Sequence, residues 1–287
     1  MNQLLDDLIK VMTLERLEMN LFRGQSRDIG SPQVFGGQVL GQALVAATAT
    51  AQDRVVHSLH AYFLRRGDFN APIVYEVDRA MDGKHFSSRR VVAIQHGRQI
   101  FNMSASFQSA ETGLEHQIAI PEVPPPESLS DIESHYRGMG DKLPPAARRI
   151  LEQKRPFEFR PVQPPDPMRR DKSAPLKYVW FRAVDKLLDD EALHRCLLAY
   201  VSDFHLLDTA LKPHGIAMIS PKLIIASIDH AMWFHRSVRV DDWLLYAIDS
   251  PSASGALGFT RGSVFARDGR LVASAAQEGL IRVTAQP

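Results

Sequence analysis

The chain has 287 residues, enough for one large domain or for two units of about 100–150 residues each. Hydrophobic residues make up 45% and charged residues 23%, and 34 basic against 33 acidic residues give a formal net charge of +1. This near-balance gives no reason to expect nucleic acid as a partner. Cys196 is the single cysteine, which excludes an intrachain disulfide and fits a reducing compartment.

The N-terminus predicts a helix and not a signal peptide. Asp6 and Asp7 interrupt the apolar residues early, and no basic start precedes them. The apolar residues recur at helical spacing: Leu4, Leu5, Leu8, Ile9, Met12 and Leu17. No apolar run is long enough to span a membrane, and the last residues are not a peroxisomal Ser-Lys-Leu address. We therefore expect a cytoplasmic protein without membrane insertion.

The first half continues with a predicted loop over 22–35 and a helix over 36–47. Small and apolar residues dominate that helix on all sides, which is typical of a helix buried nearly all round. Short apolar runs separated by Asp-Gly and His-Gly turn signals then predict strands over 55–64, 73–80, 87–96 and 99–108.

A Pro-rich segment separates the two halves. Between 110 and 176 lie 12 of the 18 prolines: Pro121, Pro124, Pro125, Pro126, Pro144, Pro145, Pro156, Pro161, Pro164, Pro165, Pro167 and Pro175. Such a chain is stiff and poor in ladder hydrogen bonds. We expect a long crossover with one or two short helices near 127–154, the alternative being a partly disordered linker. Residues 157–163 and 176–184 are expected to enter a second sheet.

The second half repeats the order of the first. A helix is predicted over 193–211, and strands over 223–235, 244–250, 258–266 and 271–283. Two related strings support a true repeat, because 58–65 ends in Phe63-Leu64-Arg65 and 227–236 ends in Phe234-His235-Arg236, 171 positions later. A self-similar chain predicts repeated units, here a buried helix held in a curved antiparallel sheet.

Several motifs resemble the acyl-CoA thioesterase II family in the same order over nearly the whole chain. They are Leu21-Phe22-Arg23-Gly24-Gln25, the stretches 34–44, 57–65 and 228–236, and Gln277-Glu278-Gly279. The resemblance implies an α+β double hot-dog fold, with an N-terminal unit at 1–110, a linker at 111–156 and a C-terminal unit at 157–287. It also implies hydrolysis of acyl-CoA thioesters, for which we expect medium- to long-chain acyl groups, no cofactor or metal, and a homodimer or homotetramer.

The resemblance further implies a catalytic set of Asp203, Ser227 and Gln277. Many bacterial members carry threonine where this chain has Ser227, and the hydroxyl is retained. Asp203 can accept a proton from water, while Ser227 and Gln277 can orient that water. Without the resemblance, the three residues would be a helix cap, a surface serine and a polar strand residue.

The first unit is expected to be degenerate. No aspartate or glutamate occurs from Val34 to Ala51, and Phe107 stands 170 positions before Gln277, which we interpret as the equivalent place.

Five further residues are predicted to bind substrate. Backbone N–H groups of Gly36 and Gly37, at a helix start, suit an oxyanion. His57 belongs to a matched motif, and Arg65 and Arg236 are candidates for the phosphates of coenzyme A.

Four alternatives remain to be weighed. A Ser-His-Asp hydrolase is disfavoured because no Gly-x-Ser-x-Gly elbow occurs. A metal site at His57/His60 or His230/His235 is disfavoured because strand residues three or five apart point to opposite faces. A hot-dog enoyl-CoA hydratase needs a histidine five residues after the aspartate, where this chain has Asp208. A non-catalytic acyl-CoA-binding module stays open.

Overall fold

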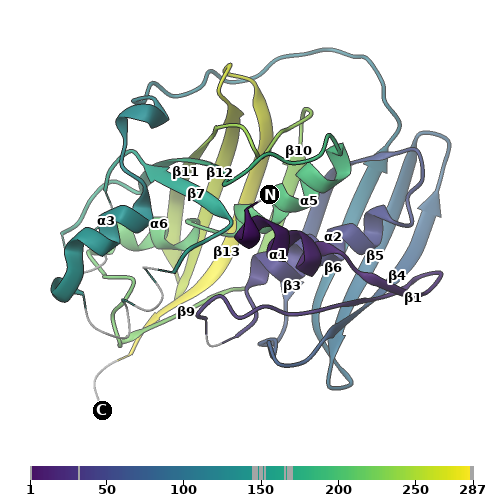
Figure 1. Ribbon diagram of the computed structural model, residues 1–287, viewed down its shortest axis with the longest axis horizontal. Coiled ribbons are helices and arrows are strands. Elements are labelled where there is room, and N and C mark those ends of the chain that lie inside the picture. The colour runs from purple at the N-terminus through teal and green to yellow at the C-terminus, as the bar shows by residue number, and fades with distance from the viewer. Residues whose placement is uncertain are drawn as a thin grey trace.

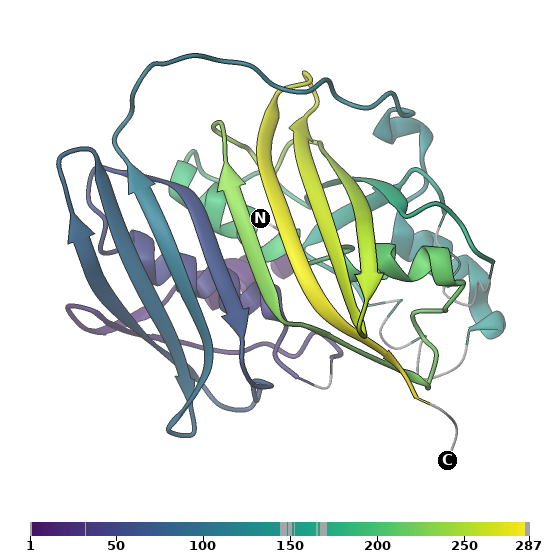
Figure 2. The ribbon, with the colours of Figure 1, turned by 180° about the vertical axis from the view of Figure 1, so that it is seen from behind.

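The computed structural model describes residues 2–31, 33–143, 148, 151, 153–164, 166 and 171–284. Within these residues a 13-stranded antiparallel sheet forms the framework of the molecule. Figure 1 shows helices α1 (Gln3–Met12), α2 (Gly36–Thr48) and α5 (Glu191–Ser202) on one face of this sheet, and Figure 2 shows the strands from the opposite face. No helix in the described ranges is long and apolar enough to cross a membrane.

The N-terminal half supplies six neighbouring strands in the order β1-β2-β4-β5-β6-β3. Their bounds are β1 (Glu15–Glu18), β2 (Leu21–Gly24), β3 (Val55–Phe63), β4 (Ile73–Asp82), β5 (Phe86–Gln95) and β6 (Arg98–Gln108). The four predicted strands are confirmed, but the first helix ends at Met12 and not near Leu17. The predicted loop also misses β2. All four residues of β1 are exposed, so this strand shows no hydrophobic alternation, and β2 with its four residues is too short for a clear pattern.

The linker crosses over the end of the sheet and is fastened to the C-terminal half (Figure 1). It contains η1 (Pro126–Ser128), α3 (Ile132–Met139) and η2 (Gly140–Lys142), and the remaining part of the predicted helical region lies mostly outside the described residues. The Trp180 indole N–H donates to the carbonyl of Pro124, and Gln117 bonds to the backbone of Gly269 and Leu271. These contacts favour an ordered crossover over a disordered one for this part of the linker.

The C-terminal half supplies the order β10-β13-β12-β11-β8-β7, with β9 also paired to β13. Its remaining elements are β7 (Phe157–Pro161), β8 (Leu176–Ala183), α6 (Leu207–Leu211), η3 (Lys212–His214), β9 (Leu223–Ser227), β10 (Asp229–Phe234), β11 (Leu244–Ser254), β12 (Leu257–Ala266) and β13 (Leu271–Val283). The predicted helix over 193–211 is wrong in one respect, because it breaks after Ser202. The predicted strand over 223–235 likewise breaks at Ile228.

The two halves join edge to edge through β3 and β10, which pair antiparallel. His60 lies opposite Ala231, and these two residues are 171 positions apart, the same offset as in the repeated strings. An approximate twofold axis therefore passes through this pair. The proposed unit boundaries at 110 and 157 lie close to the last residue of β6, Gln108, and the first of β7, Phe157.

The same pairing brings α2 and α5 into direct contact, and glycine makes the approach possible. A Cβ atom on Gly37 would lie 2.2 Å from the carbonyl oxygen of Tyr200, and one on Gly41 would lie 3.2 Å from that of Cys196. Leu40 and Leu44 on α2 are completely buried. The packing of α2 therefore depends on glycines along the face that contacts α5 and on fully buried leucines elsewhere on the helix.

Replacing Gly37 with alanine is expected to lower the free energy of unfolding by about 1–3 kcal/mol, since the new methyl group overlaps a backbone carbonyl that cannot rotate away. Equilibrium unfolding in urea checks this. Gly113→Ala is the matched control, because nothing lies within 4 Å of a Cβ atom there. Equal unfolding midpoints for the two variants would contradict the packing argument.

Candidate active site

The break after α5 positions Asp203 at the end of the helix. Ser202, the last helical residue, is held on two sides: its Oγ lies 2.9 Å from His230 Nε2, and its carbonyl accepts a 3.0 Å hydrogen bond from the Tyr246 hydroxyl. His205 then turns the chain with φ 70°, in the left-handed region that costs a non-glycine residue about 1 kcal/mol or more. The local conformation that carries Asp203 is thus imposed by tertiary contacts.

Gln277 on β13 connects the other two predicted catalytic residues. Its Nε2 donates to Asp203 Oδ1 at 2.7 Å and to Ser227 Oγ at 2.9 Å. Gln277 is 1% exposed, so these bonds form away from bulk water, where they are strong. The structure therefore brings together Asp203, Ser227 and Gln277, although they are up to 74 positions apart in the chain.

Ser227 and Gln277 each retain a polar group that can form a hydrogen bond with a water molecule. The Ser227 oxygen accepts from Gln277, so its own O–H remains able to donate. The Gln277 Oε1 atom is buried and has no hydrogen-bond partner among the described residues. A water between these groups and the Asp203 carboxylate would satisfy all three. In the same ranges no cluster of three or more potential metal ligands occurs.

The start of α2 faces the Asp203 carboxylate. A Cβ atom on Gly36 would lie 2.7 Å from Asp203 Oδ2, so only glycine leaves this carboxylate accessible. No side chain caps α2, and the amides of Gly36 and Gly37 make no hydrogen bond within the described residues. Free N–H groups at a helix start favour negative charge. The predicted oxyanion donors are therefore next to the predicted base.

A cavity of about 610 Å³ contains this site and is lined by both halves of the chain. Its walls include Phe35, Gly36, Ile132, Tyr136, Arg155, Asp203, Phe204, Leu206, Ile225, Ser227 and Gln277. A second, smaller cavity of about 180 Å³ shares Tyr136, Asp208, Met218 and Ile219 with it. Apolar residues make up much of the lining, and Asp203, Ser227 and Gln277 are among its polar residues.

Of the five predicted binding residues only Gly36 lines this cavity, and Gly37, His57, Arg65 and Arg236 lie outside its lining. His57 Nε2 is 2.8 Å from Ser106 Oγ, and burial lowers the pKa of the His57 imidazole. Arg65 donates to the Gln99 carbonyl at 2.5 Å, and Arg236 donates to that of Leu271 at 2.9 Å. The structure does not bring these three side chains to Asp203, and a part for them in binding coenzyme A remains a prediction.

Conversely, the cavity contains Arg155, Tyr136 and His205, which sequence reasoning missed. The first two come from the linker, where no periodic pattern marks functional positions. Burial raises the pKa of the Tyr136 hydroxyl and lowers that of His205 well below its usual value. Both side chains are therefore neutral near pH 7.

The equivalent place in the N-terminal half is occupied by different residues. Ala231 pairs with Ala276 and its equivalent His60 pairs with Ser104, so Gln277 corresponds to Ala105. The expectation that Phe107 takes this place is wrong by two positions. Ala276 and Ser104 are 172 positions apart, whereas Ala231 and His60 are 171 positions apart, so one fixed offset does not align both pairs of strands.

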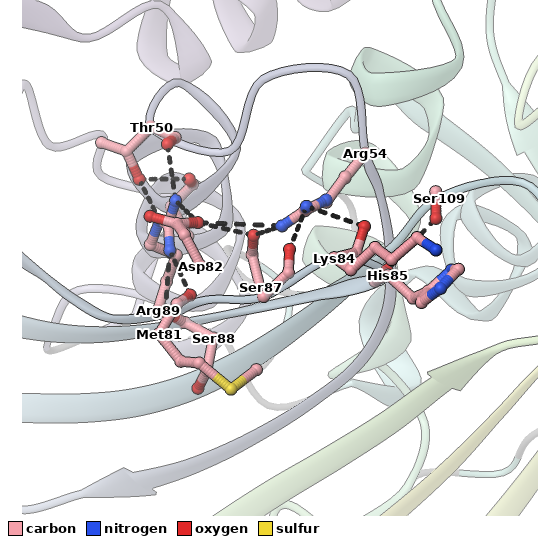
Figure 3. Close-up of polar contacts among 12 residues, drawn as sticks. Thr50, Arg54, Met81, Asp82, Lys84, His85, Ser87, Ser88, Arg89 and Ser109 are labelled. Atoms are coloured by element: carbon pink, nitrogen blue, oxygen red, sulfur yellow. Dashed lines mark hydrogen bonds and ion pairs between the residues drawn. The ribbon is translucent and has the colours of Figure 1, made fainter.

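A buried arginine lies next to Ala105 on the adjacent strand, and Figure 3 shows the polar contacts of this arginine. Arg89 lies opposite Ala105, is 2% exposed, and donates to both Thr50 oxygens at 2.9 Å and to Asp82 Oδ1 at 2.7 Å. Thr50 follows α2 as Asp203 follows α5. This half therefore has a guanidinium at the end of its helix where the other has a carboxylate, which supports a single catalytic set per chain.

Comparison with known proteins identifies similarity over the whole chain. Residues 23–108 match the family model described as acyl-CoA thioesterase N-terminal domain, and residues 147–280 match that described as acyl-CoA thioesterase. Acyl-CoA thioesterase 2 of Haemophilus influenzae is 42% identical, covering 98% of this chain and 99% of its own.

Two solved structures are similar as well. Acyl-CoA thioesterase II TesB2 from Mycobacterium marinum is 41% identical, with a TM-score of 0.79 over 97% of this chain and 99% of its own. A hot-dog protein of unknown function from Alicyclobacillus acidocaldarius is 18% identical, with a TM-score of 0.75 over 97% of this chain and 99% of its own. These comparisons confirm the predicted double hot-dog α+β fold.

Buried neutral histidines make stability depend on pH. Burial lowers the pKa of His205 and His230 below the ordinary 6.5. As the pH falls below about 6.5, these histidines therefore bind protons in the unfolded chain but stay neutral in the folded chain. The unfolding free energy should fall over this window, by up to about 1.4 kcal/mol per pH unit for each group.

Urea unfolding at pH 7.5, 6.5 and 5.5 measures this slope. A His205→Gln, His230→Gln double variant should show a smaller slope than the wild type, whereas the exposed His116→Gln control should not differ from it. An unchanged slope in the double variant would rule out these two residues as its source.

Proposed function

Because the chain belongs to the acyl-CoA thioesterase family, we propose that it hydrolyses acyl-CoA thioesters to a free fatty acid and coenzyme A, using Asp203, Ser227 and Gln277. The observation that carries this proposal is the Gln277 amide, which bonds to both Asp203 and Ser227 on the wall of a cavity lined by both halves. Such an arrangement suits water activation and needs no covalent intermediate.

The reaction would proceed by direct attack of water. Ser227 and Gln277 orient the water, and Asp203 accepts its proton as the oxygen adds to the thioester carbonyl. The negative charge that develops on the carbonyl oxygen is stabilised by the amides of Gly36 and Gly37. Collapse of the tetrahedral intermediate breaks the carbon–sulfur bond, and the departing thiolate recovers the proton from Asp203.

The cavity walls support an apolar acyl group. Ile132, Phe204, Leu206 and Ile225 line the space beside Asp203 and would exclude water from the acyl chain. The volume of about 610 Å³ falls within the range of small-molecule sites, and we propose medium- to long-chain acyl groups as substrates.

The hydratase alternative lacks a suitable partner for Asp203. Asp208, at the position where a hydratase needs histidine, pairs with Lys177 Nζ at 2.5 Å. Asp208 is therefore committed to an ion pair. Incubation with an enoyl-CoA should release free thiol and the unsaturated acid, and mass spectrometry should detect no 3-hydroxyacyl product.

We also propose a cytoplasmic homo-oligomer, a dimer or a tetramer. Support comes from exposed aromatic residues on the sheet face that carries no helix. Tyr62 is 53% exposed and Trp233 is 37% exposed, and both lie near the β3–β10 junction. Apolar groups of this size on a sheet face commonly mark protein contacts.

Asp203→Asn should lower kcat by about 10²- to 10⁴-fold with little change in KM, since the substitution keeps the shape and removes the proton acceptor. The measurement is release of free thiol from octanoyl-CoA and palmitoyl-CoA. Asp68→Asn, at a half-buried loop acid of the first unit, should retain wild-type activity. Absence of thiol release by the wild type at every chain length would favour the binding-module alternative.

Ser227→Thr should retain activity within a few-fold, because the hydroxyl that accepts from Gln277 is preserved. Ser227→Ala should lower kcat/KM by about 10- to 100-fold through loss of one water-orienting group. The same thiol assay compares the two variants. Equal losses would show that the size of the side chain matters and that its hydroxyl does not.

A further inference from the structure

Arg155 places a positive charge on the wall of the catalytic cavity. Its guanidinium lies over the ring of Phe204, 5.0 Å from the ring centre. Its backbone N–H donates to Glu133 Oε1 at 3.0 Å, but the guanidinium forms no hydrogen bond or ion pair with any residue of the described ranges. The aromatic stack orients the side chain while leaving its N–H groups available.

Two other basic residues, Lys177 and Arg160, differ from Arg155 because each forms an ion pair with a carboxylate. Lys177 is neutralised by Asp208 at 2.5 Å. Arg160 also stacks on an aromatic ring, that of Trp243, at the same 5.0 Å, yet it pairs with Glu158 at 2.6 Å and lies outside the cavity. Arg155 has the stack, but its guanidinium makes no ion pair with a carboxylate among the described residues, and the nearby Glu133 accepts from its backbone N–H instead.

An unpaired cation in such a position is costly to maintain. Burial lowers the pKa of the Arg155 guanidinium, which reflects the penalty of keeping this charge away from water. Groups of this kind are normally paired, so the position is suited to a charge that arrives with a ligand.

The location relates this charge to the reacting centre. Phe204, on which Arg155 stacks, directly follows Asp203, and its ring also contacts Phe35, which precedes Gly36. The guanidinium and the carboxylate therefore belong to one cavity and can contact one bound molecule. The His205 Nε2 atom, on the same wall, is buried and has no hydrogen-bond partner in the part of the chain that the structure describes.

Building on the proposed hydrolysis, we propose that Arg155 binds an anionic group of the thioester substrate. The planar guanidinium presents parallel N–H donors that match a carboxylate or a phosphate. An acyl-CoA can supply such a group from two sources, namely a carboxylate at the far end of the acyl chain or the phosphates of coenzyme A. Arg155 would then determine which charged thioesters are hydrolysed efficiently.

Three thioesters of equal acyl length separate these sources. Octanoyl-CoA carries only the phosphates, octanedioyl-CoA adds a terminal carboxylate, and octanoyl-pantetheine carries neither. The quantity measured is kcat/KM for thiol release by the wild type, Arg155→Gln, Arg155→Lys and the control Arg160→Gln. Loss of a charged hydrogen bond should lower kcat/KM by about 10- to 100-fold in Arg155→Gln, and Arg155→Lys should recover part of it.

The pattern of losses gives the result. A loss confined to octanedioyl-CoA assigns Arg155 to an acyl carboxylate, and a loss on both coenzyme A esters but not on octanoyl-pantetheine assigns it to the phosphates. Equal effects on all three thioesters, or none, would overturn the proposal while leaving the hydrolytic function intact. Only a wild type that releases no thiol from any of them would count against the proposed function itself. Arg160→Gln should match the wild type throughout.

Discussion

The edge-to-edge pairing of β3 with β10 is the contact on which the remaining architecture depends. It joins two half-sheets into one and packs α2 against α5. The two helices lie so close that side chains at Gly37 and Gly41 of α2 would contact the backbone of α5. The start of one helix thereby meets the end of the other, and Gly36 reaches the Asp203 carboxylate. An electropositive helix start and a potential base come from different halves of the chain, so neither half could form this centre alone.

The approximate twofold symmetry produces two places where a helix end meets the sheet, and they differ in charge: one contains a carboxylate and the other a guanidinium. One contains Asp203, Ser227 and Gln277 around unfilled hydrogen-bond capacity. The other contains Arg89, whose guanidinium is saturated by Thr50, Asp82 and nearby carbonyl groups (Figure 3). A site whose polar groups are all hydrogen-bonded contributes to stability. A site with unpaired polar groups and a strained turn at His205 is less stable, but its free groups can bind a ligand. The duplicated unit thus supports a division of labour between structure and catalysis.

Much of the fold could be predicted because it follows from local pattern. The burial of α2 is evident from its small number of polar residues, and the long strands are evident from alternation and turn signals. The repeat offset agrees with the pairing of His60 with Ala231. The break between Ser202 and α6 could not be predicted, because no glycine or proline lies there. Contacts from His230, Tyr246 and Lys177, on other elements, hold the chain in that turn.

Periodicity and repetition were sufficient for the helix-in-sheet repeat, and motif order was sufficient for the family resemblance, since both depend on residue identity at short range. The prediction of Asp203, Ser227 and Gln277 as a catalytic set came from that resemblance alone. Their convergence on one amide, the substitution of Ala105 for Gln277 in the other half, and the position of Arg155 beside the reacting centre required the packed molecule. The physical reason is that these relations join segments far apart in the chain, and bulges and irregular linkers set the distances between them without leaving a periodic signal.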